Sequence, residues 1–190
     1  MGKRRRQLAS SLVFASALMA VIALIPLPVP LRAQSQVPTT GIDPQLLANA
    51  RAGDAGAQVK LGGLYYVGHG VQQDYAQAAA WYRKAADQGL AEAQFMLGVY
   101  YDSGGRSVPQ DYAQAATWYR KAADQGFAVA QYSLGILYSR GQGVPQSFAE
   151  SYFWLNLAAA GSNGADQEDR AKTRDATATK LTPDEQSKVQ

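Results

Sequence analysis

Apolar residues recur at intervals of four in three stretches of the middle of the chain. The first stretch has Ala57, Leu61 and Tyr65, and the pattern returns twice, as Ala93, Leu97 and Tyr101 and as Ala130, Leu134 and Tyr138. A spacing of four places the side chains on one face of a helix. Each stretch is therefore predicted to form an amphipathic helix whose apolar stripe packs against a second element.

A second helix is predicted after each of these stretches. Three pairs of residues have the spacing of a capping box, in which each member bonds a backbone N–H near the other: Asp74 with Gln77, Asp111 with Gln114, and Ser147 with Glu150. Apolar residues follow each pair, and Gly89 and Gly126 are expected to end the first two of these helices in the left-handed conformation.

The two helices and their connecting loop form a repeated unit. The segment QDYAQAAAWYRKAADQG at residues 73–89 returns at 110–126 with 16 of 17 positions identical, and the tryptophans Trp81, Trp118 and Trp154 are 37 and 36 residues apart. Gly62, Gly98 and Gly135 lie beside the apolar stripes, where glycine costs about 1 kcal/mol relative to alanine in a helix. Close approach of the paired helix is the expected reason. The period predicts an all-α solenoid of stacked helix pairs.

The repeat defines the predicted domain boundaries. The array covers residues 44–165, with repeats at about 57–92, 93–129 and 130–165 and a half-repeat at 44–56 that aligns with a lone second helix. Residues 166–190 are polar and helix-compatible, and they contain another capping box at 182–185. Terminal repeats need a polar outer face, so we expect residues 166–190 to form capping helices.

The first 33 residues have the pattern of an export signal. Basic residues 3–6 precede an uncharged, largely apolar stretch at 7–31, and residues 34–43 are predicted to be a flexible linker. An uncleaved membrane anchor is the alternative, although prolines 26, 28 and 30 favour a signal peptide. The expected location is periplasmic or secreted, with inner-membrane anchoring as the alternative and membrane contact only if the segment is retained.

Charge and cysteine content narrow the functional classes. The net charge of +3 includes five basic residues in the first 33, so the remainder has 18 − 5 = 13 basic and 15 acidic residues, a net of −2. This balance gives no support for a nucleic-acid partner. The absence of cysteine from the sequence excludes disulfides and thiolate metal sites.

No catalytic, metal-binding or cofactor-binding residue is predicted. His69 is the only histidine and lies in a repeat loop, without a cysteine or second histidine to complete a metal site. Asp74 and Asp111 are explained by helix capping. The basic pairs at 83–84 and 120–121 are predicted to lie on a solvated face of the second helices.

The repeated motif resembles the Sel1-like repeat, a relative of the tetratricopeptide repeat with a longer loop. In the first copy the motif consists of Ala57-Gln58, Leu61-Gly62, Tyr65, Gly68-His69-Gly70-Val71, Asp74-Tyr75, Trp81-Tyr82 and Lys84-Ala85-Ala86. The resemblance covers about residues 45–165 and implies a right-handed superhelix with a concave groove that binds protein partners. Exported bacterial relatives often act in the cell envelope, and a few are linked to β-lactam hydrolysis.

The resemblance implies a non-catalytic adaptor of the bacterial cell envelope that binds a protein partner through the concave face. Candidate protein-binding residues are those that turn away from the stripes of the first helices: Val59, Tyr66, Phe95, Val99, Asp102, Tyr132 and Ile136. Packing against the neighbouring first helix is the alternative role for these positions. The alternative functions are an envelope hydrolase and a membrane-anchored regulator.

Overall fold

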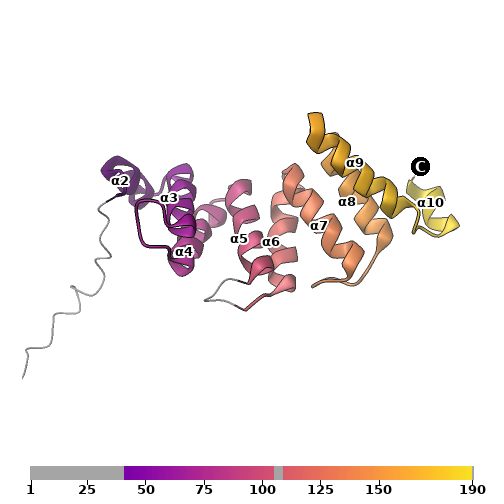
Figure 1. Cartoon of the computed structure of the whole chain (residues 1–190), viewed down its shortest axis with the longest axis horizontal. Helices are drawn as coiled ribbons and strands as arrows, with labels where there is room; N and C mark the ends of the chain where they lie inside the picture. Colours follow the sequence, from indigo (N-terminus) through magenta and orange to yellow (C-terminus); the bar gives the residue numbers. More distant parts are fainter. Residues whose placement is uncertain (1–40, 105–108, 190) are drawn as a thin grey trace, which may run out of the picture. The chain divides into compact units, whose positions relative to one another are not determined.

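A computed structural model describes residues 41–104 and 109–189 of the chain. The predicted signal peptide at 1–33 and most of the predicted linker at 34–43 lie outside the described residues. Every regular element in the described residues is a helix (Figure 1). The helices are α2 (Pro44–Ala52), α3 (Ala55–Val67), α4 (Tyr75–Asp87), α5 (Ala91–Ser103), α6 (Tyr112–Asp124), α7 (Ala128–Arg140), α8 (Phe148–Ala160), α9 (Gly164–Ala178) and α10 (Pro183–Val189).

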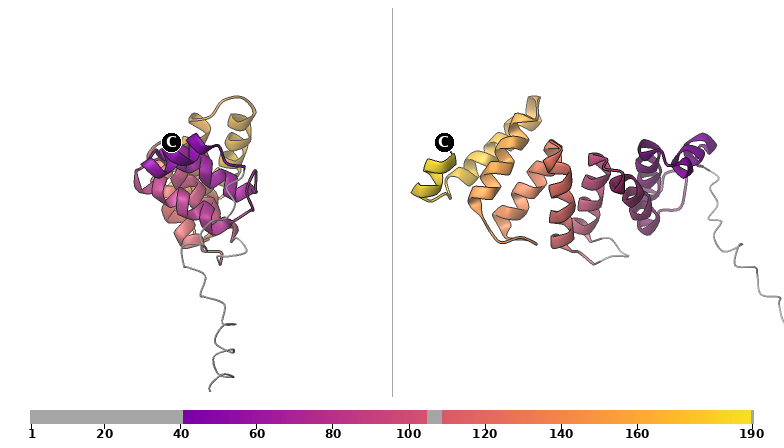
Figure 2. Two further views of the ribbon diagram at one scale, coloured as in Figure 1. Left: turned by 90° about the vertical axis from the view of Figure 1, so that its left-hand side faces the viewer. Right: turned by 180° about the vertical axis from the view of Figure 1, so that it is seen from behind.

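The helices pack in consecutive pairs. Helix α3 packs on α4, α5 on α6 and α7 on α8, and each pair contacts the next through the α4–α5 and α6–α7 contacts. Helix α2 covers the first pair, and α9 and α10 cover the last one (Figures 1 and 2). This arrangement confirms the predicted α-solenoid of three helix pairs with flanking helices.

Close helix contact explains the glycine beside each apolar stripe. A Cβ atom on Gly62 would lie 2.8 Å from the ring of Tyr82 and 3.2 Å from the carbonyl oxygen of Ala78, both on α4. In the third unit, a Cβ on Gly135 would lie 2.8 Å from Leu155 on α8. The predicted close approach of the paired helices is therefore confirmed, because no side chain fits between them.

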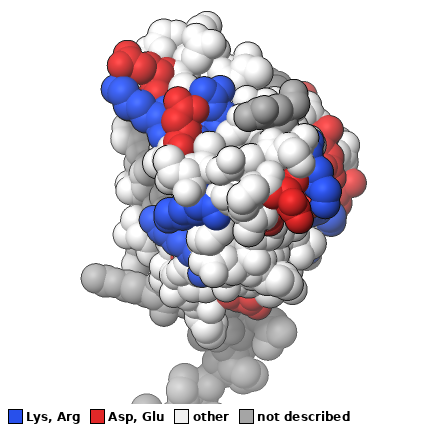
Figure 3. Space-filling model, turned by 90° about the vertical axis from the view of Figure 1, so that its right-hand side faces the viewer, with Lys and Arg blue, Asp and Glu red and all other residues white. Residues whose placement is uncertain are grey.

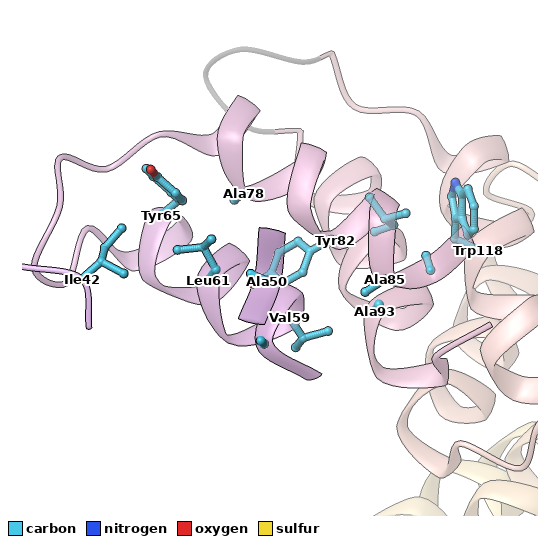
Figure 4. Close-up of a cluster of buried hydrophobic side chains, with 13 residues drawn as sticks. Ile42, Ala50, Val59, Leu61, Tyr65, Ala78, Tyr82, Ala85, Ala93 and Trp118 are labelled. Carbon is cyan, nitrogen blue, oxygen red and sulfur yellow. The ribbon is translucent and has the colours of Figure 1, made fainter. Parts of the chain in front are cut away.

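The apolar stripes lie in two clusters of buried residues between the paired helices. Leu61, Leu97 and Leu134 are at most 1% exposed, and Tyr82 packs beside Leu61 in the core of the first unit (Figure 4). Trp118, from the second unit, belongs to the same cluster. Each unit thus buries its apolar face partly against the next one, as expected for stacked repeats.

Two residues of the predicted linker pack against the first unit. Ile42 is buried in the core of the first unit (Figure 4), and Gly41 lies against the backbone of Gly70 in the loop between α3 and α4. The prediction of a linker up to residue 43 is thus too long by these residues, because Ile42 shields the open end of the first unit from water.

The second helices start at the predicted residues, but with only half of each capping box. The Asp74 carboxylate accepts hydrogen bonds from the backbone N–H groups of Ala76 (2.9 Å) and Gln77 (3.0 Å). The N–H of Asp74 donates to the carbonyl of Tyr65 at 2.9 Å, so the Gln77 side chain is not needed there. Asp111 and Ser147 repeat this arrangement with the carbonyls of Tyr101 and Tyr138. This backbone hydrogen bond to the first helix takes the place of the second bond of the capping box.

The ends of α4 and α6 match the prediction. Gly89 and Gly126 have φ angles of +89° and +83°, which L side chains rarely adopt. The N–H of Leu90 then reaches back to the carbonyl of Ala85 at 3.3 Å and closes the helix end.

Arginines of the second helices connect neighbouring units. The Arg83 guanidinium lies 4.6 Å from the centre of the Trp118 ring and donates to the Tyr101 hydroxyl at 3.1 Å. Arg120 makes the same contacts one unit later, over the Trp154 ring at 5.2 Å and with the Tyr138 hydroxyl. Arg83 is exposed, as predicted for a solvated face, and Arg120 is half-buried. The contacts with the next unit were not predicted; they arise because the repeat spacing places its aromatic rings against both arginines.

Buried glutamines connect each first helix to the helix before it. The Gln58 side chain donates to the carbonyl of Ala50 at 3.1 Å, and Gln94 and Gln131 donate to the carbonyls of Ala86 and Ala123 at 3.3 and 3.1 Å. All three glutamines are buried. Because an unpaired buried amide is costly, these bonds favour the stacked arrangement over other packings of the same helices.

The C-terminal helix α9 presents a charged surface. Lys172 pairs with Glu168 at 2.8 Å and Arg174 with Asp175 at 2.7 Å. Viewed from this end of the molecule, basic and acidic side chains lie next to one another (Figure 3). This surface has the polar character that a terminal unit of a repeat array requires.

Candidate functional site

The seven candidate residues on the first helices differ in exposure. Val59 is 8% exposed and belongs to the core of the first unit (Figure 4). Phe95 is half-buried, with its ring centre 5.7 Å from that of Tyr119 and 5.4 Å from that of Phe127. These two side chains pack against neighbouring helices, which is the alternative role considered for these positions.

Tyr66 and Val99 are two further candidates that are partly exposed. Tyr66 is half-buried and makes an edge-to-face contact with Tyr75, with ring centres 5.4 Å apart. Val99 is half-buried against the core shared by the second and third units. Each therefore retains some accessible surface while packing against its neighbours.

The other three candidates line a single pocket. Asp102 from α5 and Tyr132 and Ile136 from α7 surround a space of about 180 Å³. Asp102 and Tyr132 are 30 positions apart in the sequence, and the stacking of the second unit on the third brings them to the same pocket. The pocket between α5, α6 and α7 is hereafter called the α5–α7 pocket.

The sequence prediction missed five residues of this pocket. They are Tyr112 from α6, Ser133, Leu137 and Arg140 from α7, and Gln142 from the following loop. Tyr112 occupies the same repeat position as Tyr75 and so shows no sign of a special role. The other four stand where the repeats differ, which is the signal that would have identified them.

A buried tyrosine holds Asp102 in place at this pocket. The Tyr119 hydroxyl donates to the Asp102 carboxylate at 3.0 Å. Burial, together with the negative charge of Asp102 and this hydrogen bond, raises the pKa of Tyr119 far above its ordinary value. The phenol therefore stays protonated at any physiological pH and remains a donor to Asp102.

The α5–α7 pocket combines polar and apolar side chains. Arg140 is exposed at the end of α7, whereas Leu137 is almost fully buried and Ile136 is half-buried. Tyrosine, serine and glutamine side chains supply further hydrogen-bonding groups. Such a lining is suited to holding a mixed polar and apolar group from a binding partner.

A second hollow of about 440 Å³ lies on α6 beside the loop between α7 and α8. Its lining includes Ala113, Ala116 and Val144 together with Arg120 and Lys121. Both cations already contact aromatic rings of the scaffold, Lys121 over Trp118 at 3.9 Å and Arg120 over Trp154. The Arg120 contact belongs to the packing between units, whereas the Lys121 contact lies within α6.

Metal binding and membrane crossing are two further possibilities for the described residues. His69 is exposed in the loop after α3. Within residues 41–104 and 109–189, no group of three or more His, Cys, Asp or Glu side chains is placed to hold a metal ion. None of the helices in the same ranges is both long and apolar enough to cross a membrane.

Comparison with known proteins identifies the repeat. The family model described as Sel1 repeat matches three successive segments, residues 55–90, 91–127 and 128–163. Among curated proteins, none matches the chain significantly.

Three solved structures are similar to this chain. A protective antigen present in uropathogenic Escherichia coli strains, with an SLR fold, is 44% identical with a TM-score of 0.62; the match covers 66% of this chain and 27% of that protein, about a quarter of its length. A Sel1 repeat protein from Oxalobacter formigenes is 38% identical with a TM-score of 0.59, over 67% of this chain and 96% of that one. Cysteine-rich protein B from Helicobacter pylori is 19% identical with a TM-score of 0.50, over 64% and 92%, a likeness of fold alone.

The matched segments span more than half of the sequence, and their helix pairs are the ones that the structure stacks side by side. Proteins built from this repeat typically mediate protein–protein interactions. The chain belongs to the Sel1 repeat family.

Proposed function

We propose that this protein is a non-catalytic adaptor of the bacterial cell envelope that binds a protein partner over the first helices α3, α5 and α7. The α5–α7 pocket is the observation that carries this proposal, because it joins Asp102, Tyr132 and Ile136 into one accessible site. We accordingly place the proposed binding surface at the step between the second and third units.

The character of the repeat supports a binding role. Positions with the same residue in all three units, such as Leu97, are buried in the scaffold, whereas Tyr132, Ser133 and Arg140, which differ from their counterparts in the other units, line the pocket. A rigid stack with variable surface positions is well suited to recognising a partner without moving. Sel1 repeat proteins are generally adaptors without catalytic activity.

Export to the envelope is the second part of the proposal. It rests on the basic residues 3–6 and the uncharged stretch 7–31. Fractionation of bacterial cells producing the full chain, followed by N-terminal sequencing, tests it. A periplasmic protein that begins near residue 34 is expected, and a start at Met1 in the membrane pellet would instead support the anchored regulator.

Site-specific photo-cross-linking tests the binding surface. A benzoylphenylalanine in place of Tyr132 puts the reactive group at the pocket, and the same group in place of Phe153, which is 51% exposed on α8, serves as the matched control. We expect adducts with envelope proteins from position 132 and none of the same adducts from position 153. Identical adducts from both positions, or adducts from 153 alone, would exclude the pocket as the binding surface.

A further inference from the structure

The α5–α7 pocket has features that the corresponding places of the other units lack. The positions of Ser133, Arg140 and Gln142 are occupied in the first unit by Lys60, Val67 and His69, and in the second by Met96, Ser103 and Gly105. No other unit therefore has a cation at the end of its first helix. Among the three units, only the step between the second and third therefore has a cation at this place of the pocket.

The size of the pocket limits what it can hold. Its volume of about 180 Å³ is below the roughly 300–1,000 Å³ of sites that enclose a whole small molecule. One or two side chains of a peptide segment are a better fit to this space. The apolar floor formed by Ile136 and Leu137 favours an aliphatic side chain there.

The two charged residues of the pocket, Asp102 and Arg140, differ in how many hydrogen bonds they can still form. The Asp102 carboxylate already accepts the Tyr119 hydroxyl, so one of its oxygens is occupied. Within the part of the chain that the structure describes, Arg140 takes part in none of the ion pairs, and its side chain is exposed. A guanidinium offers five N–H donors and bonds a carboxylate in a bidentate manner. Asp102 keeps acceptor capacity on its second oxygen, whereas all five N–H donors of Arg140 are uncommitted among the described residues, so Arg140 has the larger bonding capacity for a partner.

We propose that the pocket recognises an acidic peptide segment in which an aspartate or glutamate, bound by Arg140, stands next to an aliphatic residue packed on Ile136 and Leu137. This inference rests on the proposed binding function and names the chemistry of the partner. A partner basic at this position, bound by Asp102, is the opposing outcome.

Arrays of immobilised hexapeptides test the proposal with the purified protein. Three libraries share a central leucine followed by glutamate, glutamine or lysine, with glycine, serine and alanine mixed at the other positions. The glutamate library is expected to retain about tenfold more protein than the glutamine library, because the hydrogen bonds to a charged acceptor are stronger. Equal retention on the three libraries, or no retention on any of them, would overturn the proposal.

Charge variants assign the preference to the pocket. Arg140→Gln is expected to bring the glutamate-to-glutamine ratio to about one, and Arg140→Glu to shift the preference to the lysine library. Lys60→Gln, which removes one exposed cation from the first unit, is the matched control and should keep the tenfold ratio. A circular-dichroism melt of each variant confirms that the fold is intact.

Two further results would contradict the inference. A glutamate preference that survives Arg140→Gln would place acid recognition elsewhere, and a lysine preference that Asp102→Asn abolishes would show a basic partner. In both cases cross-linking from position 132 still reports whether a partner binds this surface. Failure of the acidic specificity is thus distinguishable from failure of the proposed adaptor function.

Discussion

The substitutions Gly62→Ala and Gly63→Ala distinguish two effects on the free energy of unfolding, that of helix propensity and that of packing between helices. Both residues lie inside α3, so replacement by alanine favours the helix by about 1 kcal/mol in each case. Their surroundings differ. A Cβ on Gly62 would meet the Tyr82 ring at 2.8 Å and the Ala78 carbonyl at 3.2 Å, whereas a Cβ on Gly63 would meet the Tyr82 hydroxyl at 3.8 Å, an ordinary contact.

Gly62→Ala forces α3 and α4 apart, because the Ala78 contact is with backbone and the Tyr82 ring is fully enclosed. Overpacking of this kind costs about 1–3 kcal/mol. After the gain in propensity, we expect the free energy of unfolding to fall by up to about 2 kcal/mol for Gly62→Ala. For Gly63→Ala it should rise by up to about 1 kcal/mol.

Urea unfolding and thermal melting followed by circular dichroism measure both changes. At about 2–4 °C per kcal/mol, the two variants should shift the melting temperature in opposite directions. A Gly62→Ala protein as stable as the Gly63→Ala protein would refute the assignment of this glycine to helix contact.

Three further variant pairs test other contacts. Asp74→Ala should cost about 1 kcal/mol of stability by removing the cap of α4, whereas Gln77→Ala should be nearly neutral because its side chain makes no capping bond; urea unfolding distinguishes them. Arg83→Ala should cost about 1–2 kcal/mol by removing a cation–π contact and a hydrogen bond to the next unit, and Lys84→Ala, which loses only a contact within its own helix, should cost less; equal losses in thermal melts would contradict the inter-unit role. Burial raises the pKa of Tyr82 from 10.0 to about 12, so the unfolded chain loses the Tyr82 proton at a lower pH than the folded protein does. The stability that the protonated Tyr82 contributes is therefore complete below pH 10 and is lost as the pH rises through 12, at about 1.4 kcal/mol per pH unit. Tyr82→Phe should make unfolding free energies measured over this range less dependent on pH, and an unchanged slope would show that Tyr82 is not the group responsible.

The local pattern of the chain predicted the helices and their pairing well. Residues such as Leu61 and Leu97 repeat at helical spacing, and the glycines beside them mark where a second helix comes close. These features depend on neighbours within one turn of a helix or within one repeated unit. The structure accordingly confirmed the solenoid, the left-handed helix ends, the first half of the capping box on each second helix, and both halves of the box at residues 182–185.

Contacts between units were harder to predict. The sequence shows Arg83 beside Lys84 on a polar face, but stacking places Arg83 against Trp118, 35 positions later. For the same reason Val59 and Phe95, which the pattern turns away from the apolar stripe, lie against neighbouring helices. A helix has more than one buried face when it packs between two others, and periodicity identifies only the strongest one.

The sequence by itself determined that this protein is an array of helix pairs. The apolar stripe and the helix N-cap of each unit lie within a short stretch of chain, as do the glycines that end α4 and α6. Only the tertiary structure decided which variable positions meet, since Asp102, Tyr132 and Arg140 converge through the offset between stacked units. That offset is set by side-chain packing across the unit boundary, at the buried glutamines and the arginine–tryptophan contacts. The physical reason is the distance in sequence between the residues that interact. Local periodicity determines the fold of one unit, whereas the proposed binding surface depends on contacts between residues that are about one repeat apart.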